Sequence, residues 1–537
     1  MTPYSVGVGH APLGIALADI NNDGHLDLLT ANDPTHTVSV LLGLGKGSLG
    51  SAAAFPTGTA GAVALKVGDI NRDGRPDVVM AGSTTGGLLL GMPNGTLTPP
   101  MAQFPLNMTS NPGALALGDV DGDGFLDIVT AYGASTTSGN FDQATVLLGR
   151  EFNAFAPAVA YPLAPGSRPE AVALGDVNND GWLDIATANA NGDAVGLLLG
   201  HGNGTFGPAS SLSVGAGTGP LGIAVVDVNG DLRPDLVTAN HAGTVSVLLN
   251  AGGGTFSPVA TYPVGSFPVG IVLGDVNNDG YPDVVTAGFG SNQLSVLLGK
   301  GTGAFGPVTT YATGPTSGPL SAAIGDVNGD GAADLVSANF NAGNAGVFVS
   351  AVPVLTLTGS SSSSAGAPLT LQGTRLAGAT QVTFTNLAQV VTAVPATQFT
   401  STNFTGTPNT IGLTVPASLT VGSYRVAVAT PRGNSPTASF TVTAPLGVNK
   451  RLLGNLIDIF PSPAHARVTV RVQPLTGVST VRLSLRDALG QTVRLQNATL
   501  SPAGLRQEFD LQGLAPGVYL LQVQAGTALT TRRFLVH

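Results

Sequence analysis

The chain alternates short apolar segments with short polar segments rich in Asp, Asn and Gly, and this alternation recurs about every fifty residues through the first two-thirds of the sequence. In the fourth recurrence, the apolar segments Val172–Gly175 and Leu183–Thr187 lie on either side of the polar one. Apolar runs this short, with Gly close by, are typical of buried strands. Each unit therefore predicts a strand, a polar loop, two further strands and a connection, and a period near fifty predicts a repeat architecture.

Seven of the polar segments follow the nine-residue pattern Asp-x-Asn/Asp-x-Asp-Gly-x-x-Asp, although one of them replaces the Gly. Their first Asp residues are 50, 50, 57, 51, 48 and 51 residues apart, so the pattern recurs once in each unit. Oxygen-bearing side chains occupy positions 1, 3, 5 and 9 of every copy. In chain order they are Asp19, Asn21, Asp23 and Asp27; Asp69, Asn71, Asp73 and Asp77; Asp119, Asp121, Asp123 and Asp127; Asp176, Asn178, Asp180 and Asp184; Asp227, Asn229, Asp231 and Asp235; Asp275, Asn277, Asp279 and Asp283; and Asp326, Asn328, Asp330 and Asp334.

This spacing is suited to calcium, a hard cation that takes roughly 6–8 oxygen ligands at about 2.3–2.6 Å. Alternate residues of a tight turn point to the same side, so positions 1, 3 and 5 converge. Position 7 offers its carbonyl, and the Asp at position 9 completes the set. The layout resembles the first half of an EF-hand loop, but strands flank it in place of helices. Asx-turns without metal are the alternative. The recurrence in seven copies favours calcium, with up to seven bound Ca²⁺ ions.

Two of the loops differ from the others. The fifth has Leu232 where the other six have Gly at position 6. Gly permits the left-handed backbone that such a sharp turn requires, whereas a left-handed Leu stores on the order of 1 kcal/mol of strain. We therefore expect the fifth site to be the weakest or most distorted. The third loop has an acid at all four positions, so we expect it to be among the tightest.

The loops and several recurring segments around them resemble the FG-GAP/VCBS repeats, which form the blades of calcium-binding β-propellers such as the integrin α-subunit head. The matching segments are Thr205–Pro208, Thr255–Pro258 and Ala304–Pro307, the Val-Leu-Leu-Gly strands Val146–Gly149 and Val296–Gly299, and the Thr-Ala-Asn segments Thr187–Asn189 and Thr238–Asn240. The resemblance implies an all-β fold in which residues 1–351 form a seven-bladed calcium-binding β-propeller. The motif is specific to the family but to no single function.

The two ends of this region predict how the ring closes. In an internal unit, an outer strand such as Ala260–Gly265 precedes the next loop, and Thr2–Gly7 is a matching segment before the first loop. The last unit stops near Ser350 after its third strand. We therefore expect the N-terminal segment to supply the fourth strand of the seventh blade, which would leave few free strand edges.

Composition agrees with a turn-rich β protein, since the chain has 75 Gly, 37 Pro, 43% hydrophobic residues and 10% charged residues. It has no Cys, so metal and packing take the place of disulfides, and no apolar stretch is long enough for a transmembrane segment. Up to Ser350 there are 8 Lys/Arg and 27 Asp/Glu, and 22 of the chain's 31 acids lie at the loop positions. We attribute this acidity to the carboxylates of the predicted calcium ligands. Because the sequence shows no basic groove, we expect no nucleic acid as a partner.

Residues 353–445 lack acidic loops and are rich in Thr, Ser and Val. A serine run, Ser360–Ser364, marks a loop, and short strands such as Gly422–Val428 and Ala438–Val442 follow, with turn residues about every ten positions. This pattern predicts a β-sandwich. The region resembles an IPT/TIG immunoglobulin-like domain, and the resemblance implies a spacer more than a binding module.

Residues 455–537 predict a second β-sandwich with four ordered motifs: Pro461-Ser462-Pro463, Asp487–Gly490, Leu514–Tyr519 and the basic strand Arg532–Val536. They resemble the C-terminal sorting domain of type IX secretion in Bacteroidetes. The resemblance implies export by the type IX secretion machinery, removal of the domain, and an extracellular or outer-membrane surface location. The N-terminus has neither a basic start nor the apolar core of a signal peptide, so we expect that the true start lies upstream.

No catalytic constellation is evident, because the seven His are scattered without zinc spacing and no thiol, Gly-x-Ser-x-Gly or phosphate-binding motif exists. We therefore expect a monomeric, non-enzymatic adhesion or ligand-binding module whose partner is an extracellular protein or a glycan. The alternative is a lectin or carbohydrate-active enzyme that uses the propeller face. Position 7 should point outward, where aromatic side chains could stack on sugars. Its residues are His25, Arg75, Phe125, Trp182, Arg233, Tyr281 and Ala332.

Overall fold

The computed structural model describes residues 1–59, 61, 64–82, 85–100, 102–106, 114–133, 142–350, 353–356, 362–403, 409–430, 433–435, 437–443, 456–475, 478–525 and 528–537. The predicted all-β class is confirmed, because the described residues contain strands and two short 3₁₀ turns, η1 (Glu151–Asn153) and η2 (Ala396–Gln398), but no α-helix. The chain forms two compact units, one mainly of residues 1–354 and the other mainly of later residues. No helix in the described part of the chain is long and apolar enough to cross a membrane.

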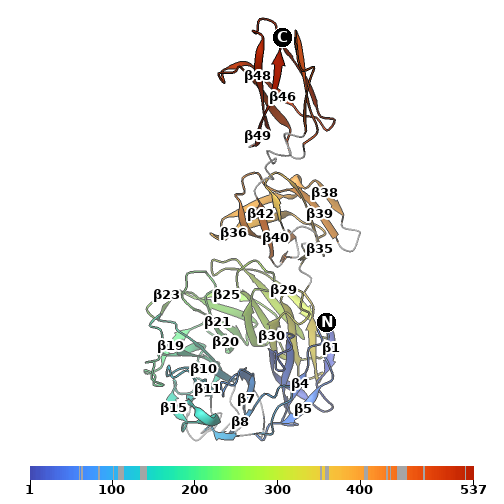
Figure 1. Ribbon diagram of the computed structural model, residues 1–537. Coiled ribbons are helices and arrows are strands. Elements are labelled where there is room, and N and C mark those ends of the chain that lie inside the picture. Colours follow the sequence, from blue (N-terminus) through green and yellow to red (C-terminus); the bar gives the residue numbers. More distant parts are fainter. Residues whose placement is uncertain are drawn as a thin grey trace. The chain divides into compact units, whose positions relative to one another are not determined.

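The first unit contains seven four-stranded antiparallel sheets among its described residues (Figure 1). They are, from first to fourth strand, β2 (Ala11–Ala18), β3 (Asp27–Asp33), β4 (Thr37–Leu41) and β5 (Ala53–Pro56); β6 (Ala64–Gly68), β7 (Asp77–Ala81), β8 (Thr85–Leu89) and β9 (Ala102–Pro105); β10 (Ala114–Gly118), β11 (Asp127–Tyr132), β12 (Gln143–Leu147) and β15 (Val159–Pro162); β16 (Pro169–Gly175), β17 (Asp184–Asn189), β18 (Ala194–Leu198) and β19 (Ser210–Ser213); β20 (Pro220–Val226), β21 (Asp235–Asn240), β22 (Thr244–Leu248) and β25 (Ala260–Pro263); β26 (Pro268–Gly274), β27 (Asp283–Gly288), β28 (Gln293–Gly299) and β29 (Phe305–Ala312); and β30 (Pro319–Gly325), β31 (Asp334–Asn339), β32 (Asn344–Phe348) and β1 (Thr2–Ser5). Two small ribbons pair β13 (Gly149–Arg150) with β14 (Ala154–Phe155) and β23 (Asn250–Gly252) with β24 (Thr255–Phe256).

The predicted pairing of the N-terminal segment with the last unit is confirmed. β1 pairs antiparallel with β32, with Thr2 opposite Val347 and Ser5 opposite Asn344. The first strands of successive sheets contact one another in order, and β30 contacts β2, so the sheets form a closed ring (Figure 1). Val6 is fully buried between the first and last sheets. The strand that begins the chain therefore joins the two ends of the ring.

Apolar residues fill most of the space between the sheets, and the second and third strands are buried along almost their whole length. All residues of β17 and β18 are buried, as expected of strands covered on both faces. The recurring Phe of the Thr-Phe-Gly-Pro segments packs against an aromatic ring of the preceding sheet. Phe206 contacts Tyr161 with ring centres 5.3 Å apart, and Phe305 contacts Tyr262 at 5.4 Å. This recurring motif therefore holds neighbouring sheets together.

The buried polar residues of the Thr-Ala-Asn segments are satisfied within their own sheets. Thr238 Oγ1 donates to Asn240 Oδ1 at 2.9 Å, and Asn240 Nδ2 donates to Ser246 Oγ at 2.8 Å. Ser246 Oγ in turn donates to the Val214 carbonyl at 3.0 Å, beyond the end of the fourth strand of the preceding sheet. Hydrogen bonding removes most of the desolvation cost of these buried groups.

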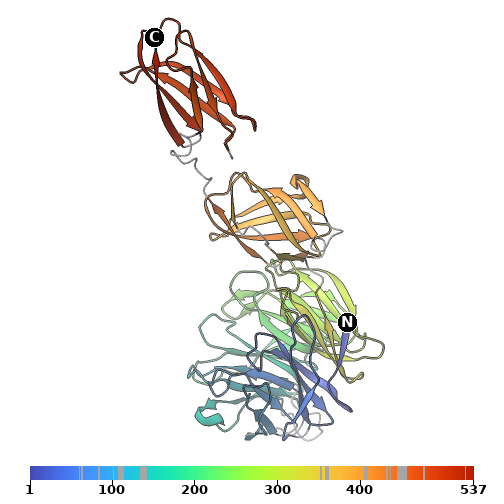
Figure 2. The ribbon, with the colours of Figure 1, turned by 45° about the vertical axis from the view of Figure 1, so that its right-hand side comes forward.

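The second unit contains four sheets among its described residues, which Figure 2 shows from a second side. The two sheets of the middle region join β33 (Val354–Thr356), β35 (Pro368–Thr374), β39 (Asn409–Thr414) and β38 (Ser401–Asn403), and β34 (Ser362–Ser364), β42 (Ala438–Thr443), β40 (Gly422–Thr430), β36 (Gln381–Asn386) and β37 (Val391–Pro395), with β41 (Gly433–Asn434) on β40. The two C-terminal sheets join β43 (Ile457–Phe460), β44 (Arg467–Val472) and β47 (Leu505–Asp510), and β46 (Thr492–Thr499), β45 (Thr480–Arg486), β48 (Gly517–Ala525) and β49 (Ala528–Val536).

One tyrosine in each of these regions forms the same short-range contact. The Tyr424 hydroxyl donates to the Thr420 carbonyl at 3.1 Å, and the Tyr519 hydroxyl donates to the Ala515 carbonyl at 3.0 Å. A hydroxyl bonded to the backbone a few residues upstream is the tyrosine corner of immunoglobulin-like sandwiches. Part of the predicted serine loop, residues 360–361, and the segment between the two predicted β-sandwiches, residues 446–454, lie outside the described residues.

Candidate metal centres

Each of the seven acidic loops connects the first strand of a sheet to its second. Position 1 follows the first strand directly or by one residue, and the Asp at position 9 is the first residue of the second strand, as in β17 and β21. Because the seven sheets have the same strand order, the loops lie at one end of the ring. The ring therefore presents the predicted ligand residues in one row around that end.

Within a loop, backbone amides turn the carboxylates of positions 1 and 5 inward. The second carboxylate oxygen of position 1 accepts a hydrogen bond from the position-6 amide in all seven loops, at 2.6–2.8 Å. One oxygen of the position-5 Asp accepts the position-7 amide at 2.9–3.0 Å in all seven. In five loops the position-3 Asn amide donates to the other position-5 oxygen, at 2.8–3.2 Å. These hydrogen bonds fix the side chains of positions 1 and 5 within the turn, and in five loops they also link position 3 to position 5.

The Asp at position 9 has a role that the sequence did not suggest. One of its oxygens accepts the amide of position 2 at 2.7–3.1 Å. The other accepts an amide just after the third strand of the same sheet at 2.6–2.9 Å. In the fourth loop, Asp184 joins Val177 and Gly200 in this way. In the first six loops each of these oxygens keeps a further lone pair, so the Asp can still contribute to a cation site. Both oxygens of Asp334 accept a second hydrogen bond, from Asn328 Nδ2.

These seven Asp side chains are buried, and burial raises their pKa. The pKa of Asp127, Asp184, Asp283 and Asp334 rises to about 6, first because of burial and also because of the neighbouring loop carboxylates. Backbone hydrogen bonds oppose the rise. Asp27, Asp77 and Asp235 also have a raised pKa, mainly from burial. A buried carboxylate beside two further acids is an electrostatic cost that a bound cation removes, so the residues present fit calcium.

The third loop brings its acids closest together. Ligand atoms of Asp119, Asp121 and Asp127 all lie within 4.8 Å of one another, the tightest acidic group among the described residues. Arg150, which follows β12, reaches this group from outside the loop. Its Nη1 lies 3.0 Å from Asp121 Oδ2 and 2.7 Å from Asp123 Oδ2. The guanidinium therefore neutralises part of the extra charge that led us to expect the tightest site here.

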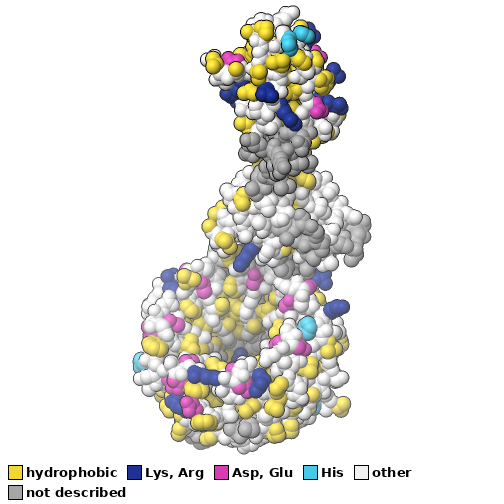
Figure 3. All heavy atoms as spheres, viewed as in Figure 1, with side chains coloured by type: hydrophobic (Ala, Val, Ile, Leu, Met, Phe, Trp, Pro, Cys, Tyr) yellow, Lys and Arg dark blue, Asp and Glu magenta, His cyan; other side chains and the backbone are white. Residues whose placement is uncertain are grey.

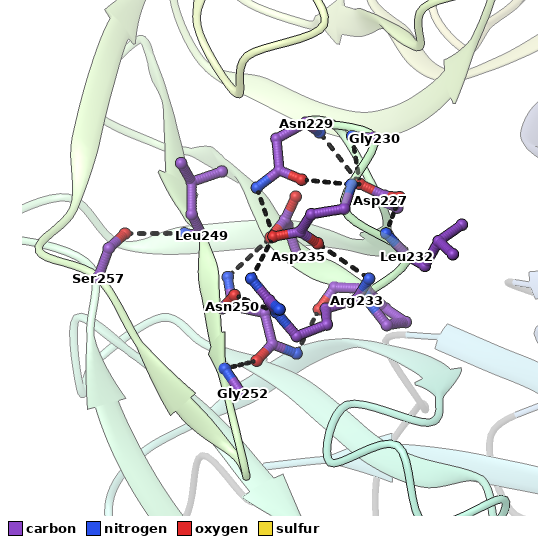
Figure 4. A network of polar contacts seen from close by, with 12 residues as sticks. Asp227, Asn229, Gly230, Leu232, Arg233, Asp235, Leu249, Asn250, Gly252 and Ser257 are labelled. Atoms are coloured by element: carbon purple, nitrogen blue, oxygen red, sulfur yellow. Dashed lines mark hydrogen bonds and ion pairs between the residues drawn. The ribbon is translucent and has the colours of Figure 1, made fainter.

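The fifth loop keeps its hydrogen bonds despite the missing Gly (Figure 4). Leu232 has φ of 66°, the left-handed conformation that the sequence predicts, and its amide still donates to Asp227 Oδ2 at 2.7 Å. Its side chain is 84% exposed, so no packing contact offsets the strain. The Arg233 guanidinium lies 2.5 Å from Asp231 Oδ2 and donates to the Asn250 carbonyl at 3.0 Å. The fifth loop thus combines a strained backbone with a resident cationic side chain.

The seventh loop departs from the others at positions 3 and 7. Asn328 Nδ2 donates to both oxygens of Asp334, at 3.2 and 3.1 Å, whereas the other Asn residues of the loops donate to position 5. The expectation that position 7 points outward is wrong for Ala332, which is fully buried. It holds in part for Trp182 and Tyr281, which are 44% and 45% exposed. Small side chains at this position can pack inward because nothing in the loop requires their exposure.

Sequence reasoning missed two features of the loops. Position 4 is left-handed in every loop, with φ between 56° and 79°, as at Asn22 and Gly122. The signal was present, because position 4 is Asn or Gly in all loops except the second, which has Arg72. Arg72 donates to the carbonyls of Asp123 and Gly124 at 3.0 Å, joining the second loop to the third. Neither arginine contact is recognisable in the sequence, because Arg72 contacts residues 51 and 52 positions away and Arg150 contacts residues 29 and 27 positions away.

Comparison with known families is consistent with this arrangement. The family model described as FG-GAP-like repeat matches residues 19–80, 69–130, 176–238, 227–286 and 275–337, which together cover more than half of the chain. The model described as secretion system C-terminal sorting domain matches residues 458–537. That domain implies export by type IX secretion to the cell surface or the medium. No curated protein matches the chain.

Two solved structures are similar in fold. One is an Agrocybe aegerita lectin described as recognising non-reducing terminal N-acetylglucosamine, with 20% identity, a TM-score of 0.42, and coverage of 62% of this chain and 86% of the lectin. The other is the periplasmic gluconolactonase PpgL of Pseudomonas aeruginosa, with 15% identity, a TM-score of 0.43, and coverage of 56% and 86%.

Proposed function

Because the chain belongs to the FG-GAP-like repeat family, we propose that residues 1–351 form a seven-bladed β-propeller that binds calcium in its loops and acts outside the cell as a ligand-binding or adhesion module. The observation that supports calcium best is that the Asp at position 9 is buried in all seven loops. Each of these buried carboxylates shares its loop with two more, those of the Asp residues at positions 1 and 5. Calcium supplies the positive charge that lets these carboxylates stay ionised. The chain supplies rigid loops that orient the oxygens.

We expect the calcium affinity of each loop to depend on whether a cationic side chain already lies beside its carboxylates. The first, fourth and sixth loops share the same internal hydrogen bonds and should bind calcium similarly. The second has these bonds too, but Arg75 lies 3.0 Å from Asp73, so it should bind calcium more weakly than those three. The third should bind less tightly than its four acids alone would imply, because Arg150 already contacts two of them. The fifth should be weakest, because Leu232 strains it and Arg233 lies on Asp231.

The test of calcium is the metal content and melting temperature of the full chain, with Asp180→Asn as the variant. Calcium by elemental analysis should approach seven equivalents, and chelation should lower the melting temperature by many degrees, since each site at 100-fold saturation adds up to about 2.7 kcal/mol. Asp180→Asn should lose about one equivalent. Asp487→Asn is the matched control, because Asp487 accepts two amides in a similar turn of the C-terminal region. No calcium, with an unchanged melt in EDTA, would refute the proposal.

For the other regions, we propose that residues 353–445 form an IPT/TIG spacer and that residues 455–537 form a sorting domain that is removed after export. The two-sheet arrangement and the tyrosine corner at Tyr424 support the immunoglobulin-like assignment. The match at residues 458–537 supports the sorting domain. We propose that the mature protein is a monomer without catalytic activity.

Glycan binding is a second candidate, favoured by two half-exposed aromatic rings beside the loops. Trp182 packs on the backbone of Gly202 and Tyr281 on that of Gly301, so each ring is held in place while the residue stays about half exposed. Such faces can stack on sugars. A glycan array with and without EDTA tests this, with Trp182→Ala and Tyr281→Ala as variants and Tyr311→Ala, an exposed ring away from the loops, as control. Binding that all three variants retain would argue against these rings, and hydrolysis of any glycan would contradict the non-enzymatic assignment.

A further inference from the structure

A channel of about 370 Å³ runs through the centre of the ring, and the first strands of all seven sheets form its wall. Figure 3 shows hydrophobic surface around this central hollow. Most of the wall residues are aliphatic, but polar atoms contribute about as much of the wall's surface as apolar atoms do. The aliphatic residues include Ile15, Leu65, Leu115, Val172, Ile223 and Ile271, which occupy the same place in six of the strands, four residues before each loop. A volume of this size is in the range of small-molecule sites.

One residue of the wall breaks the sevenfold pattern. Three residues before the loop, the second sheet has Lys66, whereas the other six sheets have Ala or Val. Those residues are Ala16, Ala116, Ala173, Ala224, Val272 and Ala323. Ala occupies five of the six equivalent positions, so the strand does not require a lysine here. A charged side chain facing an apolar channel costs free energy unless something else stabilises its charge.

Lys66 has no partner of opposite charge in the protein. Among the described residues it makes no ion pair, and the sequence of the remaining segments contains no Asp or Glu. The other charged residue of the wall, Glu170, is already paired with Arg168, with Nε and Oε1 2.6 Å apart. Lys66 is accessible to water inside the channel. It is nevertheless surrounded by the wall, and this burial lowers its pKa.

From this geometry we propose that the central channel binds a small organic anion, a carboxylate with an aliphatic body, with Lys66 as its counter-ion. The ammonium group would pair with the carboxylate, and the aliphatic wall would bury the rest of the ligand. The channel partly encloses this ion pair, so water screens it less than it would screen a pair on the outer surface. The site uses residues of the first strands and none of the loop ligands, so it is independent of calcium.

The experiment measures binding of octanoate, of its neutral analogue octanamide and of inorganic phosphate to the full chain by titration calorimetry. Wild-type protein should bind octanoate at least tenfold more tightly than octanamide, and phosphate should bind more weakly than octanoate. Lys66→Gln should abolish the tenfold preference. The control Lys300→Gln removes a lysine on an exposed loop and should preserve it. Lys66→Met retains the length of the side chain without its charge, so it should also lose the preference while melting no lower than wild type.

Three results would overturn the proposal. Octanoate that does not bind, or binds no better than octanamide, would show that the lysine does not act as a counter-ion. A preference that persists in both Lys66 variants would place the anion elsewhere. Phosphate binding as tight as octanoate would mean that the aliphatic wall contributes nothing. A loss of preference in folded Lys66→Met, with Lys300→Gln unchanged, would support the site.

Discussion

Because the Asp residues at position 9 are buried, we expect a fall in pH to stabilise the metal-free protein but not the calcium-bound protein. Four of them, Asp127, Asp184, Asp283 and Asp334, have a pKa of about 6 in the folded protein, against a usual value of 3.8. Without metal, the folded state therefore holds more protons than the unfolded chain between about pH 4 and 6. Its free energy of unfolding rises as the pH falls through this window.

The size of the effect follows from these pKa values. Between pH 7.5 and 5, a carboxyl group whose pKa shifts from 3.8 to about 6 contributes about 1.4 kcal/mol, so four independent groups contribute about 5 kcal/mol. A propeller region of about 350 residues unfolds with an entropy of about 0.7 kcal/mol/K. The melting temperature in EDTA should therefore rise by about 7 °C as the pH falls. Asp23, Asp193 and Asp227 have a lowered pKa and titrate below this window.

In saturating calcium the sign reverses, because protons compete with the cation for the same carboxylates. The melting temperature should then stay level or fall from pH 7.5 to 5. Differential scanning calorimetry at both pH values, with EDTA or calcium, measures this difference. Asp184→Asn cannot titrate and should remove about a quarter of the rise in EDTA, whereas Asp193→Asn, on the connection between β17 and β18, should leave it unchanged. A melting temperature in EDTA that stays flat or falls would show that these Asp residues are not protonated in the folded protein.

Four further predictions concern single features. Val6→Ala should lower the free energy of unfolding by about 2 kcal/mol in urea because Val6 is fully buried, while Val8→Ala, at a site 99% exposed, should not. Arg150→Gln should raise calcium affinity at the third loop in a calcium titration, and an unchanged affinity would show that the guanidinium does not compete. Leu232→Gly should relieve left-handed strain and stabilise the protein by up to about 1 kcal/mol. Deleting residues 458–537 should prevent release from a type IX-secreting host, and mass spectrometry of secreted wild-type protein should find that segment removed.

The sequence by itself determined the parts of the loops that depend on near neighbours. The amides that orient positions 1 and 5 lie within five residues of their acceptors, so spacing and turn residues were enough to predict a tight turn at each loop, as at Asp176 and Gly181. The left-handed Leu232 followed from the same local rule. The pairing of β1 with β32 is a long-range contact, yet it was predictable because a repeat with a missing strand at one end and a spare strand at the other has few other ways to close.

Only the tertiary structure decided what each loop and the channel contain. Arg150 lies 29 residues from Asp121, and Asp184 accepts an amide 16 residues away, so neither contact leaves a local pattern. Lys66 is an ordinary strand residue in the sequence and becomes unusual only because it lines the channel that the first strands of seven sheets enclose. The spacing of residues determines which groups can meet within one turn. The packing of the ring determines which charges lie together where little water can reach them. Because low solvation strengthens electrostatic interactions, this packing sets the electrostatic energies of these charges.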